Sequence, residues 1–199
     1  QYVIVGVSFV VMWFLIGIYG PFCEEFVYLG VLYRGYKTSG KIIGAVLLSS
    51  LSFGLMHMNL NQALYAFAIG IFLAMLVEAA GSLWASVFCH MIFNSIQVCM
   101  MFLSDWMVDV FYGGELGDMQ ETLTNESLMA AMSVYLVIAA VTTPIAVCVL
   151  AWIVKNENRV EIVRNLHRRE GEAGGYLLSI PFIVALVLCL GFISLEFIL

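Results

Sequence analysis

The chain is poor in charged residues and in proline. Of its 199 residues only 11% are charged and 63% are hydrophobic, whereas an ordinary soluble domain has roughly 25% charged residues. This shortage of charge excludes a soluble globular protein. With only 3 prolines and 14% aromatic residues, the composition also excludes collagen-like and disordered chains, which lack apolar surface to bury. The sequence therefore predicts a membrane protein that crosses the bilayer several times.

Cysteine is sparse and carries no pattern. The 5 cysteines all fall in apolar runs, and none forms a CxxC pair. A disulfide framework and a thiolate metal site are therefore not indicated, and we expect each cysteine to be a small buried hydrophobic residue. Residues 1–20 also lack a basic segment and a small-residue cleavage site, so they predict a membrane span and not a signal peptide. Because the chain begins inside an apolar run, we expect further residues to precede it in the natural protein.

The apolar runs are long enough for helices that cross a bilayer of roughly 30 Å. They are apolar all round, which excludes the alternation of a β-barrel. We therefore predict an all-α bundle of about six to seven helices that forms a single membrane-embedded domain over residues 1–199. The predicted runs are 2–19, 22–36, 42–58, 62–80, 83–104, 128–154 and 176–198.

The charged residues predict the orientation in the membrane. All 8 cationic residues lie in two groups, Arg34–Lys41 and Lys155–Arg169, while residues 105–127 contain acids and no Lys or Arg. Because basic loops stay in the cytoplasm, we expect 34–41 and 155–175 to be cytoplasmic and the acidic loop 105–127 to lie on the far side.

A helix break is predicted at Gly20-Pro21. Proline suits the first turn of a helix, and Glu24 and Glu25 near that start would oppose the positive end of its dipole. A break within the membrane is tolerated only where protein or a water-filled cavity surrounds it. We therefore expect a cavity near these residues.

Few ionisable residues occur inside the predicted spans, and each costs at least about 2.5–3.5 kcal/mol on insertion scales. Two of them, Glu78 and Glu196, lie near the ends of their spans, where their side chains can reach the membrane surface, and we assign them no role. Each of the others taken alone is explained by a polar patch or by an interhelical hydrogen bond. The remaining polar residues are Glu24, Glu25, His57 and His90, together with the amides Asn94 and Gln97.

The combination points to hydrolysis. Two carboxylates, two histidines and an asparagine on three predicted helices supply a base, an imidazole and donors for an oxyanion. His90 and Asn94 stand at i and i+4, which places them one helical turn apart. We expect Glu24, His57, His90 and Asn94 to converge on one water-accessible cavity, because separate burial would leave several groups unsatisfied.

These motifs resemble the CPBP intramembrane protease family, which includes the type II CAAX prenyl endopeptidases and the abortive-infection and bacteriocin self-immunity proteins. The resemblance rests on Glu24-Glu25, on Phe53-x-x-x-His57 and on His90-x-x-x-Asn94, within a core of about residues 21–97. It implies that Glu24 and His57 activate water, that His90 and Asn94 bind the oxyanion, and that Glu25 supports the site.

One position departs from the family pattern. The first motif usually continues Glu-Glu-x-x-x-Arg, and here that place is Leu29. Without a cation one turn away, we expect Glu25 either to carry a proton or to accept a hydrogen bond from another helix. The protein would then be a slow enzyme or a relative that only binds, and Leu29→Arg is expected to raise its activity.

The leading hypothesis is an intramembrane endopeptidase that cuts a membrane-associated or prenylated peptide. The alternatives are a non-catalytic immunity or adaptor protein that binds a toxin or partner protein, and a transporter, for which no repeat is found. Nucleic acid is not an expected partner. Glu24, His57 and His90 could hold zinc as a three-ligand catalytic site. Because there is no His-Glu-x-x-His motif, we favour water activation that requires no metal.

Overall fold

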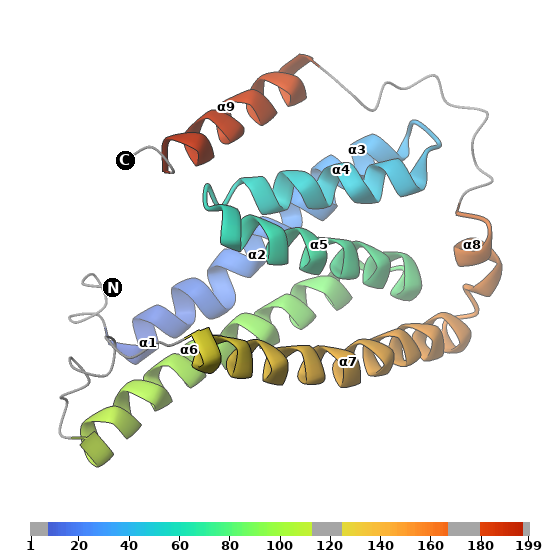
Figure 1. The fold of residues 1–199 in the computed structure, drawn as a ribbon. Coiled ribbons are helices and arrows are strands. Elements are labelled where there is room, and N and C mark those ends of the chain that lie inside the picture. Colours follow the sequence, from blue (N-terminus) through green and yellow to red (C-terminus); the bar gives the residue numbers. More distant parts are fainter. Residues whose placement is uncertain (1–7, 113–124, 167–179, 197–199) are drawn as a thin grey trace.

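The computed structural model describes residues 8–112, 125–166 and 180–196, and within these ranges it contains helices and no strand. This confirms the all-α fold. The first helix, Phe9–Lys37, consists of α1 (Phe9–Met12), η1 (Trp13–Tyr19), α2 (Gly20–Glu25), η2 (Phe26–Tyr33) and α3 (Arg34–Lys37). It is followed by α4 (Ile42–Leu55), α5 (Leu60–Ala80), α6 (Leu83–Tyr112), α7 (Asn125–Asn156), α8 (Val160–Arg164) and α9 (Ile180–Glu196) (Figure 1).

The predicted break at Gly20-Pro21 is wrong, because the first helix runs through it without interruption. Proline normally interrupts a helix, since it lacks an N–H and its ring collides with the carbonyl four residues earlier. Here the turns before it, η1, are π-helical, and the N–H of Gly20 donates to the carbonyl of Leu15, five residues back. The wider π turn makes room for Pro21, so the predicted runs 2–19 and 22–36 merge into one helix.

Helix α4 is shorter than predicted. It ends at Leu55, so His57 lies in the turn that follows and not on a span over 42–58. Its 14 residues measure about 21 Å at 1.5 Å per residue, which is less than the roughly 30 Å of the hydrocarbon core. Helix α4 by itself is therefore too short to cross the membrane.

The turn after α4 leads directly into α5, and the two helices pack side by side (Figure 1). Met58 adopts a left-handed conformation with φ 54°, and the Asn59 side chain caps α5 by accepting from the N–H of Gln62 at 3.0 Å. The backbones approach closely where a Cβ on Gly54 would lie 2.6 Å from the carbonyl oxygen of Ala63. Only glycine fits at that point, so the packing fixes the turn that carries His57.

Helix α6 is longer than its predicted span. It continues past residue 104 to Tyr112, and α7 begins at Asn125. The helix therefore includes Asp105 and Asp109, which the sequence analysis assigned to the acidic loop 105–127. Aspartate is only a modest helix former but does not end a helix whose other residues are apolar. Residues 113–124 lie outside the described residues.

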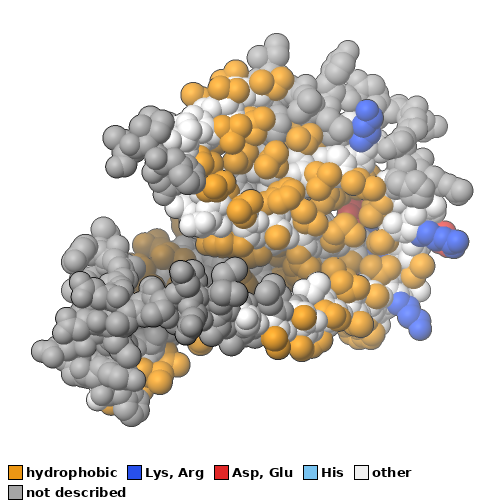
Figure 2. Space-filling model, in the orientation of Figure 1, with side chains coloured by type: hydrophobic (Ala, Val, Ile, Leu, Met, Phe, Trp, Pro, Cys, Tyr) orange, Lys and Arg blue, Asp and Glu red, His pale blue; other side chains and the backbone are white. Residues whose placement is uncertain are grey.

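The described part of the chain has the surface of an integral membrane protein. Apolar side chains cover most of the coloured, described part of the face in Figure 2, and the Lys and Arg side chains that are visible there lie toward one edge. Of the described helices, three are long and apolar enough to cross a membrane, namely Phe9–Lys37, Leu60–Ala80 and Leu83–Ser104. An apolar surface of this kind is stable in lipid, because the apolar side chains need no hydrogen bonds and the helices satisfy the backbone groups internally.

The five cysteines are free thiols. The prediction that they are buried is wrong: Cys99 and Cys148 are exposed, and the other three are half-buried. A small apolar side chain facing lipid loses nothing by exposure, so the soluble-protein rule that places cysteine in the core does not hold here.

Glu78 is buried at the end of α5 and bonded within the protein, whereas the sequence predicted only that its side chain could reach the membrane surface. Its side chain is 3% exposed, and one carboxylate oxygen accepts from the hydroxyl of Tyr33 at 2.8 Å and from the ammonium of Lys37. Arg159 donates from Nε to the backbone carbonyl of Glu78 at 2.7 Å. Lys37 and Arg159, which come from the two basic segments of the sequence, thus lie at the same end of the bundle. The predicted orientation requires this, and the side of the membrane on which that end lies stays a prediction.

Leu29 belongs to the apolar core. It is 4% exposed and packs in a cluster of buried residues that includes Tyr33, Ile42, Val46 and Leu73. The cluster joins the first helix to α4 and α5. Leu29 therefore serves the packing of these helices.

Candidate active site

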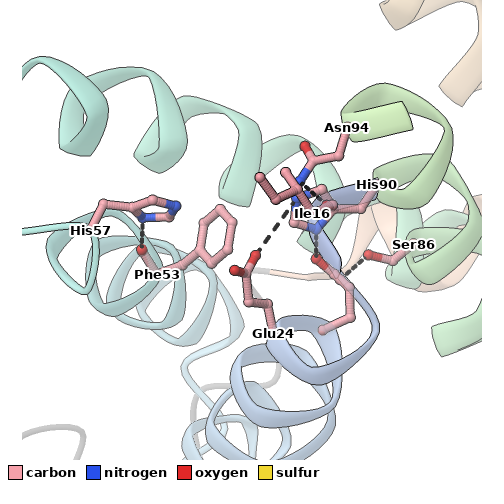
Figure 3. A network of polar contacts seen from close by, with 8 residues as sticks. Ile16, Glu24, Phe53, His57, Ser86, His90 and Asn94 are labelled. Carbon is pink, nitrogen blue, oxygen red and sulfur yellow. Dashed lines mark hydrogen bonds and ion pairs between the residues drawn. The ribbon is translucent and has the colours of Figure 1, made fainter. Parts of the chain in front are cut away.

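Four of the five predicted site residues line one cavity. Its volume is about 310 Å³, and its walls include Glu24, His57, His90 and Asn94. They come from the first helix, from the turn after α4, and from α6 (Figure 3). The structure thus brings these four predicted residues to the wall of one cavity, without the helix break expected at Gly20-Pro21.

Glu25 lies behind this cavity and holds His90. Its Oε1 lies 2.9 Å from Nδ1 of His90, and its Oε2 accepts a hydrogen bond from the hydroxyl of Ser86. Because a carboxylate accepts, Nδ1 of His90 is the donor. The sequence predicted that Glu25 either carries a proton or accepts a hydrogen bond from another helix. In the structure both of its oxygens are bonded to side chains of α6.

Glu24 faces the other side of the same imidazole. Its Oε2 lies 3.8 Å from Nε2 of His90, which is an ion-pair distance and too long for a direct hydrogen bond. The Glu24 side chain is 21% exposed, whereas that of His90 is 4% exposed. The adjacent carboxylates thus have different surroundings, since Glu24 is open to the cavity and Glu25 is enclosed.

His57 is held by its own turn. Its Nδ1 lies 2.9 Å from the carbonyl oxygen of Phe53. A carbonyl can only accept, so Nδ1 carries the proton and Nε2 of the neutral ring is left free for water. The ring of Phe53 contacts both imidazoles edge-on, with centroids 5.3 Å from His57 and 5.6 Å from His90, and stands between them in Figure 3.

Pro21 explains how Asn94 is placed. In the π register the carbonyl of Ile16 would pair with residue 21, and in the α register the carbonyl of Gly17 would do so, but proline has no N–H. These same two carbonyls accept from α6: Asn94 donates to Ile16 at 3.2 Å and Ser95 donates to Gly17 at 3.4 Å. The amide of Asn94 is thus oriented by a gap in the backbone bonding of the first helix.

The candidate zinc ligands do not come together. Within the described residues, no group of three His, Cys, Asp or Glu side chains is arranged to hold a metal ion. This includes Glu24, His57 and His90, since the ring of Phe53 stands between the two imidazoles. The geometry of these residues does not fit a three-ligand site.

Two groups at the site, Ser86 and Gln62, were not predicted from the sequence. Ser86 bonds Glu25, and Gln62 lines the cavity together with Gln97. Ser86 precedes His90 by four residues, so helical spacing could have placed it on the same face. Serine is common in membrane helices, however, and nothing in the sequence alone marks this one.

Comparison with known proteins finds similarity to a protein family and to a curated relative. Residues 6–96 match the family described as "Type II CAAX prenyl endopeptidase Rce1-like". The protein named "Putative membrane peptidase YdiL" of Bacillus subtilis (strain 168) is 29% identical over 83 residues, which are 42% of this chain and 34% of that protein. The match thus spans about a third of the curated relative. No solved structure matches the chain.

Proposed function

We propose that this chain hydrolyses a peptide bond in a membrane-associated or prenylated peptide. The premise is its membership of the CPBP intramembrane protease family, which rests on the match over residues 6–96. The observation that carries the proposal is the cavity lined by Glu24, His57, His90 and Asn94. A base and oxyanion donors facing one space are the groups that peptide hydrolysis needs.

In the proposed reaction, a water molecule is held between Glu24 and Nε2 of His57. Glu24 takes one proton as the water oxygen adds to the peptide carbonyl carbon. The carbonyl oxygen becomes an oxyanion, which accepts from Asn94 and from Nε2 of His90. The C–N bond then breaks, and Glu24 returns its proton to the leaving amine. His90 donates from Nε2 only when it carries both protons, and the two carboxylates beside it balance that charge.

The test is Glu24→Gln in the purified protein. The amide keeps the shape of the side chain but cannot accept the proton, so we expect cleavage to be abolished while the melting temperature stays within a few degrees of that of the wild type. The probes are quenched-fluorescent peptides of two kinds, one with a farnesylated C-terminal cysteine and one with a single apolar span. Glu157→Gln, at an exposed position, is the matched control and should cut at the wild-type rate.

Each outcome has a meaning. If Glu24→Gln cuts as fast as the wild type, the proposed mechanism is wrong. If neither peptide is cut by the wild type, and the protein instead retains a partner protein, the non-catalytic immunity or adaptor function replaces the proposal. The kind of peptide that is cut identifies the substrate class.

A further inference from the structure

We infer that Ser86 is a positioning residue for the proposed reaction, and that it acts on His90 through Glu25. The expected effect on catalysis rests on the proposed function, whereas the expected effect on the orientation of the His90 ring does not. Ser86 is 0% exposed and donates its hydroxyl to Oε2 of Glu25. It lies one helical turn before His90 on α6, whereas Glu25 lies on the first helix.

The two oxygens of Glu25 are divided between two donors on α6. Ser86 occupies Oε2, and Nδ1 of His90 occupies Oε1 at 2.9 Å. A carboxylate fixed at both oxygens cannot rotate about its last bond, so the direction in which Oε1 points is set by Ser86. The direction of Oε1 in turn sets the plane of the His90 ring.

The orientation of His90 matters because its two nitrogens have different tasks. With Nδ1–H donated to Glu25, Nε2 is the nitrogen that faces Glu24 and the cavity. Loss of the Ser86 hydroxyl would leave Oε2 buried without a donor, and Glu25 would turn to satisfy it. His90 would then lose its fixed ring plane, and Nε2 would no longer be aimed at the oxyanion.

The hydrogen bond of the Ser86 hydroxyl differs from those of the serines on helix α4. Other buried or half-buried serines on the neighbouring helix α4 bond a carbonyl of their own helix, as Ser49 does with Val46 and Ser52 does with Leu48. Ser86 instead bonds a carboxylate 61 positions away in the chain. Side-chain hydrogen bonds between membrane helices hold these helices in register, and this one ends on the partner of His90.

The kinetic test compares Ser86→Ala with Ser49→Ala. Both serines are 0% exposed, so the two substitutions delete the same buried atom. We expect Ser86→Ala to lower kcat by about 10- to 100-fold, because small misplacements of a reacting group have effects of this size, and to leave KM within about twofold. Ser49→Ala should change neither. Equal kcat values in the two variants would overturn the inference.

A double-mutant cycle tests whether Ser86 acts through Glu25. In a Glu25→Gln background, adding Ser86→Ala should cause less than a further twofold loss of kcat, since the group that Ser86 orients is already altered. If Ser86 only supports helix packing, the two losses will multiply. That result would contradict the positioning role.

A readout without substrate separates this inference from the proposed function. In protein carrying ¹⁵N-labelled histidine, studied at a pH at which the His90 ring is neutral, the His90 signal, identified by its loss in His90→Gln, should show a protonated Nδ1 in the wild type and in Ser49→Ala. In Ser86→Ala it should shift toward a mixture of the two tautomers. An unchanged His90 signal in Ser86→Ala would overturn the inference even if the protein cuts peptides, and the expected shift would support it even if no peptide is cut.

Discussion

Glu25 and His90 form a pair that is almost completely enclosed between the first helix and α6. Oε1 of Glu25 and Nδ1 of His90 are 2.9 Å apart, and the two side chains are 3% and 4% exposed. Buried charged groups need partners of this kind, because a lone one has a large desolvation cost. Glu25 finds its partners on another helix, so it does not depend on a cation from its own helix.

This pairing reverses the outcome expected for Leu29→Arg. The sequence predicts a gain in activity through pairing with Glu25. In the structure Leu29 is 4% exposed among apolar residues, and both oxygens of Glu25 are already engaged. We now expect a loss of about 3–5 kcal/mol in the free energy of unfolding, the usual cost of an uncompensated buried charge. Thermal unfolding in detergent against Leu29→Met measures it, and a stable variant with raised activity would restore the first expectation.

Asn94→Ala should lower kcat by about 10² to 10³, the usual effect of losing one oxyanion donor, and His90→Ala should lower it at least as much. Ser95→Ala is the control for Asn94, because Ser95 also donates to a carbonyl of the first helix but does not line the cavity. We expect Ser95→Ala to keep kcat within about twofold. Equal losses in the Asn94 and Ser95 variants would show that helix docking, and not an oxyanion contact, is responsible.

Pro21→Ala tests whether the freed carbonyls orient Asn94. The new N–H can pair with the carbonyl of Ile16 or Gly17 and compete with the side chains of α6. We expect kcat to fall by about tenfold from misplacement of Asn94, with no loss of thermal stability. Pro144→Ala, inside α7, is the matched control and should keep the wild-type kcat. A Pro21→Ala variant with unchanged kcat would refute this account of Asn94.

Metal dependence is tested by elemental analysis of the purified protein together with chelation. Because Glu24, His57 and His90 do not form a metal-binding group in the structure, we expect less than one zinc per ten chains and full activity after dialysis against a chelator. His57→Ala should lower activity through its effect on water. Zinc at one per chain in the wild type, lost together with activity in His57→Ala, would contradict the prediction.

The orientation in the membrane is tested by labelling single cysteines with an impermeant reagent. In a background without the five natural cysteines, Lys155→Cys should be labelled from the cytoplasmic side, and Ser127→Cys from the opposite side only. Labelling of Ser127→Cys from the cytoplasmic side alone would invert the predicted topology.

The sequence was sufficient for the features that depend on local chemistry. Long apolar runs with almost no charge have one stable solution in lipid, the hydrogen-bonded helix, so the fold class followed from composition. The spacing of His90 and Asn94 on one helical face, and the cost of isolated polar groups in a membrane, predicted the shared cavity. Helix limits were less predictable, since the continuity of the first helix at Gly20-Pro21 and the ends of α4 and α6 depend on packing.

Only the tertiary structure decided which groups meet. It placed His57 behind Phe53, enclosed Glu25 with Ser86 and His90, and left Glu24 open to the cavity. The sequence makes Glu24 and Glu25 neighbours of the same chemical type, and local rules cannot distinguish them. Their difference arises because α6 crosses the first helix on the side of Glu25, and the position of that crossing is set by contacts such as Gly17 with Ser95, between residues 78 positions apart in the chain.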